Sequence, residues 1–125
     1  MTKTVALRTV LSTLLKTITP NVYYEDAPDT KPYPYIVYEL NEVTHSYGKT
    51  LYQLEINVFG YGANTAPIET LADTTQRTLN KYSFINTDIQ ITIYQGLRRT
   101  IKEEDEQIIR RRLLFEVQLH ELKGE

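Results

Sequence analysis

Two stretches of the chain carry apolar residues at the spacing of an amphipathic helix. In residues 4–18 these residues recur every three or four positions and form one stripe, at Leu7, Val10, Leu11, Leu14, Leu15 and Ile18. Pro20 ends this helix, because proline disfavours helical geometry in the residue before it. Residues 65–82 repeat the pattern, with the stripe Ile68, Leu71, Ala72, Thr75 and Leu79. Thr65 or Asn64 is the expected cap of this second helix.

Most of the other apolar residues alternate with polar ones, which predicts strands with one face on a core. Residues 50–60 alternate most cleanly, and their apolar face consists of Tyr52, Leu54, Ile56 and Val58. In the strand predicted at 108–121, the apolar face consists of Leu113, Phe115, Val117 and Leu119. Further strands are predicted at 21–25, 35–43 and 88–97. Turns and loops are predicted between the strands and helices, at 26–34, 44–49 and 102–107.

The predicted order of elements is therefore α-β-β-β-α-β-β. Runs of strands with short links indicate an α+β fold with one mainly antiparallel sheet. Two amphipathic helices need an apolar surface to cover, so both are expected on the same face of that sheet. The opposite face is then open and carries Gln53, Glu55, Asn57, Gln90 and Thr92. With 125 residues the chain has the length of a single domain, residues 1–125.

The composition excludes several chemistries. The chain has no cysteine, which excludes a disulfide scaffold, a thiol nucleophile and a cysteine-ligated zinc site. Its 14 basic and 16 acidic residues give a net charge of −2, so no broad basic field is available to hold nucleic acid. We expect no signal peptide, because the basic residues Lys3, Arg8 and Lys16 are spread through the apolar positions of the N-terminal segment. We expect no membrane association, because no apolar stretch reaches the roughly 18 residues of a membrane span.

No pattern of residues indicates catalysis or ligand binding. His45 and His120 belong to no metal-ligand spacing, and the sequence contains no nucleophile elbow and no phosphate-binding loop. The acidic run at 103–106 is typical of a solvated hairpin tip, since acid–base catalysis needs carboxylates held in different environments. We therefore predict no enzyme activity, no catalytic residue, no metal and no cofactor. The ten tyrosines suit either strand packing or a protein interface.

Arginines gather on the predicted C-terminal hairpin beside the acidic run. Alternation places Arg110 and Arg112 on one face of the last strand and Arg111 on the other, and Arg98 and Arg99 lie opposite if residues 97–101 pair with that strand. Arginine is enriched at protein interfaces, and the hairpin is longer than typical strands. We therefore predict a subunit or partner interface that consists of Arg98, Arg99, Glu103, Glu104, Asp105, Glu106, Arg110 and Arg112.

Two hypotheses explain this charged hairpin. In the first, Arg110 or Arg112 of one subunit meets the acidic tip at 103–106 of the next, which is a head-to-tail contact that can close into a ring. In the second, the chain is a binding module that contacts nucleic-acid phosphates through the same arginines.

Three segments lie in an order of elements that resembles a known family: VYYEDAP at 22–28, PYIVY at 34–38 and LEINVFG at 54–60. They stand between a helical segment, ALRTVLSTLLKTI, and a closing strand, RRRLLFEVQLHE. Over residues 5–121 this arrangement resembles the tail completion, or tail terminator, proteins of long-tailed bacteriophages and their prophage remnants.

The resemblance implies a small α+β protein that forms a ring, typically a hexamer, at the head-proximal end of the phage tail tube. Such a ring stops tube polymerisation and offers a docking surface to the head connector. The implied partners are other copies of the chain, the tail tube protein and the head connector proteins, while DNA passes through the channel without specific binding. The implied location is the virion, after synthesis in the cytoplasm of the host bacterium. Head–tail joining proteins of similar size are an open alternative.

Overall fold

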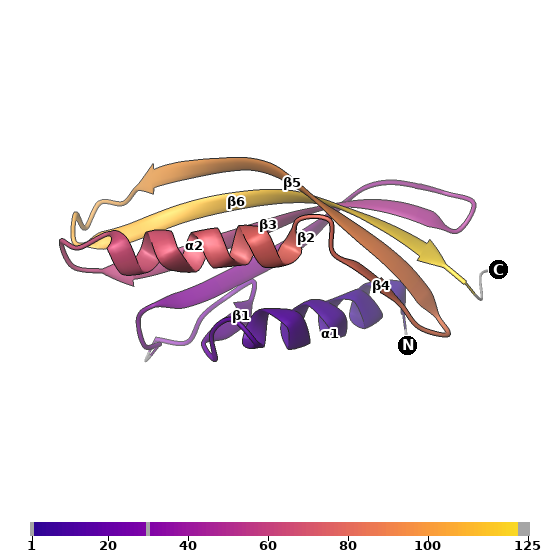
Figure 1. Cartoon of the computed structure of the whole chain (residues 1–125), viewed down its shortest axis with the longest axis horizontal. Helices are drawn as coiled ribbons and strands as arrows, with labels where there is room; N and C mark the ends of the chain where they lie inside the picture. The colour runs from indigo at the N-terminus through magenta and orange to yellow at the C-terminus, as the bar shows by residue number, and fades with distance from the viewer. Residues whose placement is uncertain (1, 30, 123–125) are drawn as a thin grey trace.

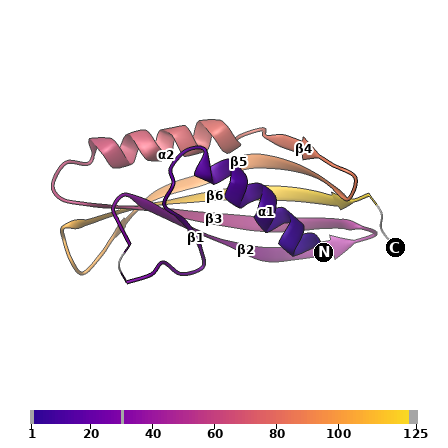
Figure 2. The same ribbon diagram turned by 90° about the horizontal axis from the view of Figure 1, so that it is seen from below.

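Two helices cover one face of a single sheet, as the sequence predicts, and this sheet has six strands where the sequence predicts five (Figure 1). The computed structural model describes residues 2–29 and 31–122. In Figure 2, α2 runs along the strands and α1 crosses them obliquely. In chain order the elements are α1 (Lys3–Lys16), β1 (Val22–Tyr24), β2 (Tyr35–Ser46), β3 (Lys49–Tyr61), α2 (Ala66–Leu79), β4 (Ser83–Ile85), β5 (Ile89–Lys102) and β6 (Ile108–Glu121).

The sheet confirms the mainly antiparallel α+β prediction. Its strand order is β1-β2-β3-β6-β5-β4, and every neighbouring pair is antiparallel except β1 and β2, which are parallel. The predicted end of the second helix at residue 82 was wrong: α2 ends at Leu79, and the short strand β4 follows it. Lys81, with a φ of 65°, turns the chain between them. A strand of three residues has no legible periodicity, so the alternation did not reveal β4.

Both long hairpins extend further than the alternation indicates. The predicted loop at 44–49 was wrong, because β2 and β3 continue to a two-residue turn at Tyr47 and Gly48. Their φ values of 51° and 77° are typical of a type I′ turn. The predicted end of a strand at residue 97 was also wrong, since β5 continues to Lys102. A bulge between Gln95 and Arg98 shifts the alternation there while β5 stays paired with β6.

The predicted apolar stripes form the core between the helices and the sheet. Their buried members include Leu7, Leu11 and Leu15 of α1 and Ile68, Ala72 and Leu79 of α2. Two buried tyrosines bind α1 to the sheet: the hydroxyl of Tyr38 shares a hydrogen bond with Ser12, and that of Tyr52 shares one of 2.8 Å with Thr4. Burial raises the pKa of Tyr38. These tyrosines therefore confirm the strand-packing role.

The face of the sheet opposite the helices is only partly covered. The five residues predicted on it alternate with buried core residues of β3 and β5, which confirms their placement. One pocket is lined by Val37, Glu55 and Asn57 of the open face and by Glu25, Asp26, Ala27 and Lys31, which lie between the parallel strands β1 and β2. Asn57 is only 4% exposed, although it lies on the face without helices.

Truncating the core of β3 and β6 should destabilise the protein strongly. Ile56→Ala and Phe115→Ala should each lower the free energy of unfolding by about 2–5 kcal/mol, because each removes a buried side chain and leaves a cavity. Leu14→Ala should cost less, since Leu14 is only half-buried. Urea unfolding followed by circular dichroism measures these differences. A loss of less than about 0.5 kcal/mol for both β-strand variants would contradict the core described here.

Candidate interaction surface

The register of β5 and β6 brings the predicted arginines together on one hairpin. Arg98 stands opposite Leu113, and Arg99 stands opposite Arg112. On β6, Arg110 and Arg112 face the open side of the sheet and Arg111 faces α2, as alternation predicts. The cluster therefore forms as predicted, but its members point in two directions and take different partners.

Arg98 and Arg111 bind α2 to the sheet. The carboxylate of Glu69 accepts hydrogen bonds from Nε of Arg111 at 3.0 Å and from Nη2 of Arg98 at 2.7 Å. Arg98 also donates to Asp73 at 2.6 Å and to Gln76 at 2.8 Å. The hydrogen bond from Arg111, supported by Arg98, lowers the pKa of Glu69, and the hydrogen bond to Asp73 raises the pKa of Arg98. Arg98 thus acts within the subunit.

Arg110 and Arg112 have partners on the open face. Nη1 of Arg110 donates to Glu103 at 3.0 Å, and Nε of Arg110 donates to Asn57 at 2.9 Å. The Arg110 guanidinium also lies over the ring of Phe59, 5.2 Å from its centroid. Nε of Arg112 lies 3.6 Å from a carboxylate oxygen of Glu55. Arg110 and Glu103 therefore meet within one chain, where we expected a carboxylate of the next subunit.

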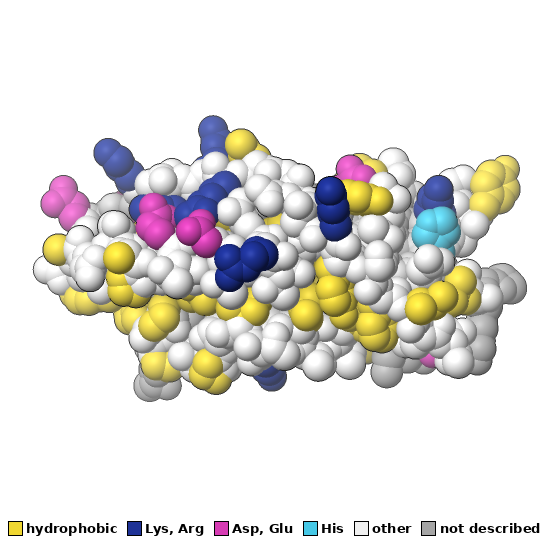
Figure 3. Space-filling model, viewed as in Figure 1, with side chains coloured by type: hydrophobic (Ala, Val, Ile, Leu, Met, Phe, Trp, Pro, Cys, Tyr) yellow, Lys and Arg dark blue, Asp and Glu magenta, His cyan; other side chains and the backbone are white. Residues whose placement is uncertain are grey.

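The other charged residues of the predicted interface are exposed. Arg99 makes no ion pair with any residue in 2–29 or 31–122. Glu104, Asp105 and Glu106 form the exposed tip, where Asp105 accepts a hydrogen bond of 3.0 Å from the backbone N–H of Gln107. Figure 3 shows basic and acidic side chains intermingled at this end of the molecule. These four residues are free to meet a partner.

An aromatic cluster at the edge of the open face was missed by the sequence analysis. Tyr35 stacks on Phe59 with 4.8 Å between the ring centroids, and Tyr33 lies 5.3 Å from Tyr35 and 5.4 Å from Tyr61. Burial raises the pKa of Tyr35 to about 12. Tyr33 and Tyr61 stay 39% and 54% exposed. The repeated tyrosines of the segment at 33–35 were a signal for it, but the pairing with Phe59 and Tyr61 depends on the strand register.

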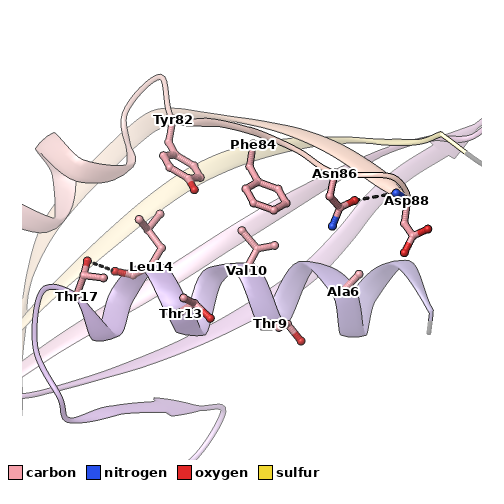
Figure 4. A pocket seen from close by; sticks show the side chains of 10 residues that line it. All are labelled: Ala6, Thr9, Val10, Thr13, Leu14, Thr17, Tyr82, Phe84, Asn86 and Asp88. Carbon is pink, nitrogen blue, oxygen red and sulfur yellow. Dashed lines mark hydrogen bonds between the residues drawn. The ribbon is translucent and has the colours of Figure 1, made fainter.

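An apolar groove between α1 and β4 was also missed (Figure 4). Its volume is about 460 Å³, and Tyr82 and Phe84 point across it toward Val10 and Leu14 of α1. The sequence analysis assigned Val10 and Leu14 to the buried stripe of the helix. They are half-buried here, because the short β4 covers less of α1 than a longer strand would.

The described residues contain neither a cluster of metal-binding side chains nor a candidate membrane helix. Within residues 2–29 and 31–122, no group of three or more His, Asp or Glu side chains is placed to bind a metal ion. In the same ranges, no helix is long and apolar enough to cross a membrane. The distinctive surface features are therefore the charged hairpin, the aromatic cluster and the groove.

The fold resembles that of a chain in a solved structure described as the virion of a native gene transfer agent particle. The two chains superimpose with a TM-score of 0.66 over 85% of this chain and 84% of that chain, at 13% sequence identity. At this identity the likeness establishes the fold alone. No protein-family model matches the sequence, and no curated protein matches it. The chain thus shares its fold with a chain of that particle.

Removing the charge of Glu69 should weaken the contact of α2 with the sheet. Glu69→Gln should lower the free energy of unfolding at neutral pH by about 1 kcal/mol, a modest value because Glu69 is 43% exposed and solvent screens its ion pairs. Folding lowers the pKa of Glu69, so its contribution is complete above the unfolded pKa and is lost as the pH falls through the folded value.

The difference between the two proteins should therefore disappear in acid, once the pH lies below the folded pKa of Glu69, as measured by urea unfolding at several pH values. Asp73→Asn is the matched control, since it removes the more exposed partner of Arg98. A Glu69→Gln effect that persists unchanged in acid would show that the charge is not responsible.

Proposed function

We propose that this chain is a structural virion subunit that forms a ring at the head-proximal end of a phage tail tube. The ring ends tube polymerisation and provides the surface that joins the tail to the head. The observation that carries the proposal is the likeness, over most of both chains, to the fold of a chain in a gene transfer agent virion. The resemblance of residues 5–121 to tail completion proteins supports the particular position in the virion.

The aromatic cluster offers a contact surface for other proteins. Tyr33 and Tyr61 are 39% and 54% exposed, and their ring centroids lie 5.4 Å apart. Tyrosine is enriched at protein interfaces. The proposed partners are other copies of the chain, the tail tube protein and the head connector proteins. The proposed location is the virion, reached after synthesis in the host cytoplasm.

The nucleic-acid hypothesis is less favoured by the geometry. Four of its five arginines, Arg98, Arg110, Arg111 and Arg112, are paired with carboxylates of the same chain. Phosphate binding would have to compete with these pairs, and Arg99 alone of the five has no such pair among the described residues. DNA that passes through the proposed ring therefore needs no specific contact with this cluster.

The purified protein should cap tail tubes. Added to tubes of the phage or prophage whose genome encodes this chain, it should form ring-shaped particles at one end of each tube and prevent further growth. Negative-stain electron microscopy measures capping and tube length, and native mass spectrometry gives the number of subunits, which we expect to be six. Tubes that keep growing in the presence of the protein, with no particle at either end, would refute the proposal.

The exposed acidic tip should contribute to capping. The double variant Glu104→Lys, Glu106→Lys should remain folded, because both side chains are exposed, and should cap about tenfold fewer tubes. Arg110→Glu is a poorer test, since it places a carboxylate beside Glu103 within the same chain. The exposed Arg77→Glu variant on α2 is the control and should cap normally. Normal capping by the double lysine variant would show that the acidic tip is not part of the interface.

A further inference from the structure

Two segments at opposite sides of the sheet have an open backbone edge. β1 pairs with β2 only as far as Tyr38, and β4 pairs with β5 only at residues 90–92. Among the described residues, no strand lies beside residues 40–46 of β2 or residues 98–102 of β5. We call these segments the β2 edge and the β5 edge. The β5 edge has five residues, and the β2 edge has seven with a bulge between Glu42 and Thr44, against about 5–6 residues in an ordinary strand.

The β2 edge presents unpaired backbone groups. The N–H of Ile36 donates outward to Asn21, and the carbonyl of Tyr38 accepts from the N–H of Glu25. Since alternate residues of an antiparallel strand point the same way, Leu40 and Glu42 also direct their backbone groups outward. No described residue bonds to them there.

The β5 edge, on the other side of the sheet, also presents unpaired backbone groups. The N–H of Ile93 donates outward to Tyr82, and after the bulge the register with β6 turns the backbone groups of Arg98, Thr100 and Lys102 outward. Rows of unpaired N–H and carbonyl groups of this kind are templates for pairing with another strand.

The β2 edge and the β5 edge run in opposite directions, as two antiparallel strands must. β2 is antiparallel to β3, β3 to β6 and β6 to β5, so β5 runs antiparallel to β2. A second copy laid beside the first in the same orientation therefore brings the β5 edge antiparallel to the β2 edge. Arg98 contacts α2 and Glu42 contacts α1, so the outward residues of both edges lie on the helix side. A shared sheet would thus keep the helices of both copies on one side.

The side chains of the two edges are also complementary. The β5 edge carries Arg99 and Lys102, whereas Glu42 lies at the β2 edge, where it also pairs with Lys3 of α1 at 3.3 Å. Arg99 stands opposite Arg112 on the same face, and such a pair of like charges is unfavourable within one sheet. A carboxylate from another copy would offset that repulsion. Val43, which is 57% exposed, supplies apolar contact area at the β2 edge.

We propose that the β5 edge of one copy pairs antiparallel with the β2 edge of the next, so that the subunits share a continuous sheet. The proposal rests on the proposed ring and names its subunit contact. Because the two edges differ, the contact is heterologous, and such contacts close into a ring when the rotation between copies permits. Bulges and charges also serve to protect edges from pairing in monomeric proteins, and the experiment decides between the two roles.

Disulfide trapping tests the contact, because the chain has no native cysteine. Arg99→Cys is mixed with either Asn41→Cys or Val43→Cys, which covers two registers, and the mixture is oxidised at the concentration at which rings are imaged. All three positions are exposed. We expect a heterodisulfide dimer, detected by mass spectrometry. The matched control is Gln90→Cys in place of Arg99→Cys, since Gln90 is exposed on the same strand but its edge is paired with Ile85.

The trapped dimer should form at least tenfold more from Arg99→Cys than from Gln90→Cys. Equal trapping in both mixtures overturns the proposal. If no heterodisulfide forms with either Asn41→Cys or Val43→Cys, the shared sheet is also overturned. Rings imaged in that same sample would then leave the proposed tail-terminating function intact. Selective trapping by a protein that does not cap tubes would uphold the shared sheet and refute the tail-terminating role.

A backbone variant provides a second measurement. Thr100→Pro removes an outward N–H that has no partner among residues 2–29 and 31–122, whereas Thr100→Val keeps it. Self-association, measured by analytical ultracentrifugation, should weaken at least tenfold for the proline variant and stay unchanged for the valine variant. Circular dichroism establishes that both are folded. Equal association by two folded variants overturns the pairing.

Discussion

The pairing of β3 with β6 is the interaction on which the rest of the molecule depends. It runs from Lys49 opposite His120 to Tyr61 opposite Ile108, and each strand carries a further hairpin partner on its other side. One face of this pair supplies the apolar surface that both helices cover. At Gly60 an added Cβ would lie 2.1 Å from Cδ1 of Ile68, so the absence of a side chain on β3 allows α2 to approach the sheet closely.

Carboxylates of the same chain neutralise most arginines of the C-terminal hairpin, although the hairpin is rich in arginine and the protein has a net charge of −2. Arg98 and Arg111 share the carboxylate of Glu69, and this arrangement binds α2 to two strands. Arg110 lies against Phe59 and binds Glu103, which fixes the start of the acidic tip. Four of the five arginines of the hairpin are thereby paired with carboxylates of the same subunit. Within the predicted interface, Arg99 and the tip residues Glu104, Asp105 and Glu106 remain exposed.

The proposed ring and the proposed shared sheet have a common physical basis. A sheet with short strands at both sides leaves long neighbours partly unpaired, and here the two unpaired segments run in opposite directions. Hydrogen bonds between the two edges fix the relative orientation of neighbouring copies. Apolar contact supplies most of the affinity, because exposed ion pairs are individually weak. Such a contact orients every subunit identically, as a ring on the end of a tube requires.

The sequence by itself determined the two amphipathic helices, the alternating faces of β3 and β6 and the fold class, because periodicity reports directly which side chains face a core. It also placed Arg110 and Arg112 on one face and Arg111 on the other. Tertiary structure decided what those arginines bind, since Glu69 and Asn57 are distant in the chain. It likewise decided the position of β4, the aromatic cluster and the open edges. These features depend on strand order and register, which are set by contacts between segments far apart in the chain and leave no local pattern.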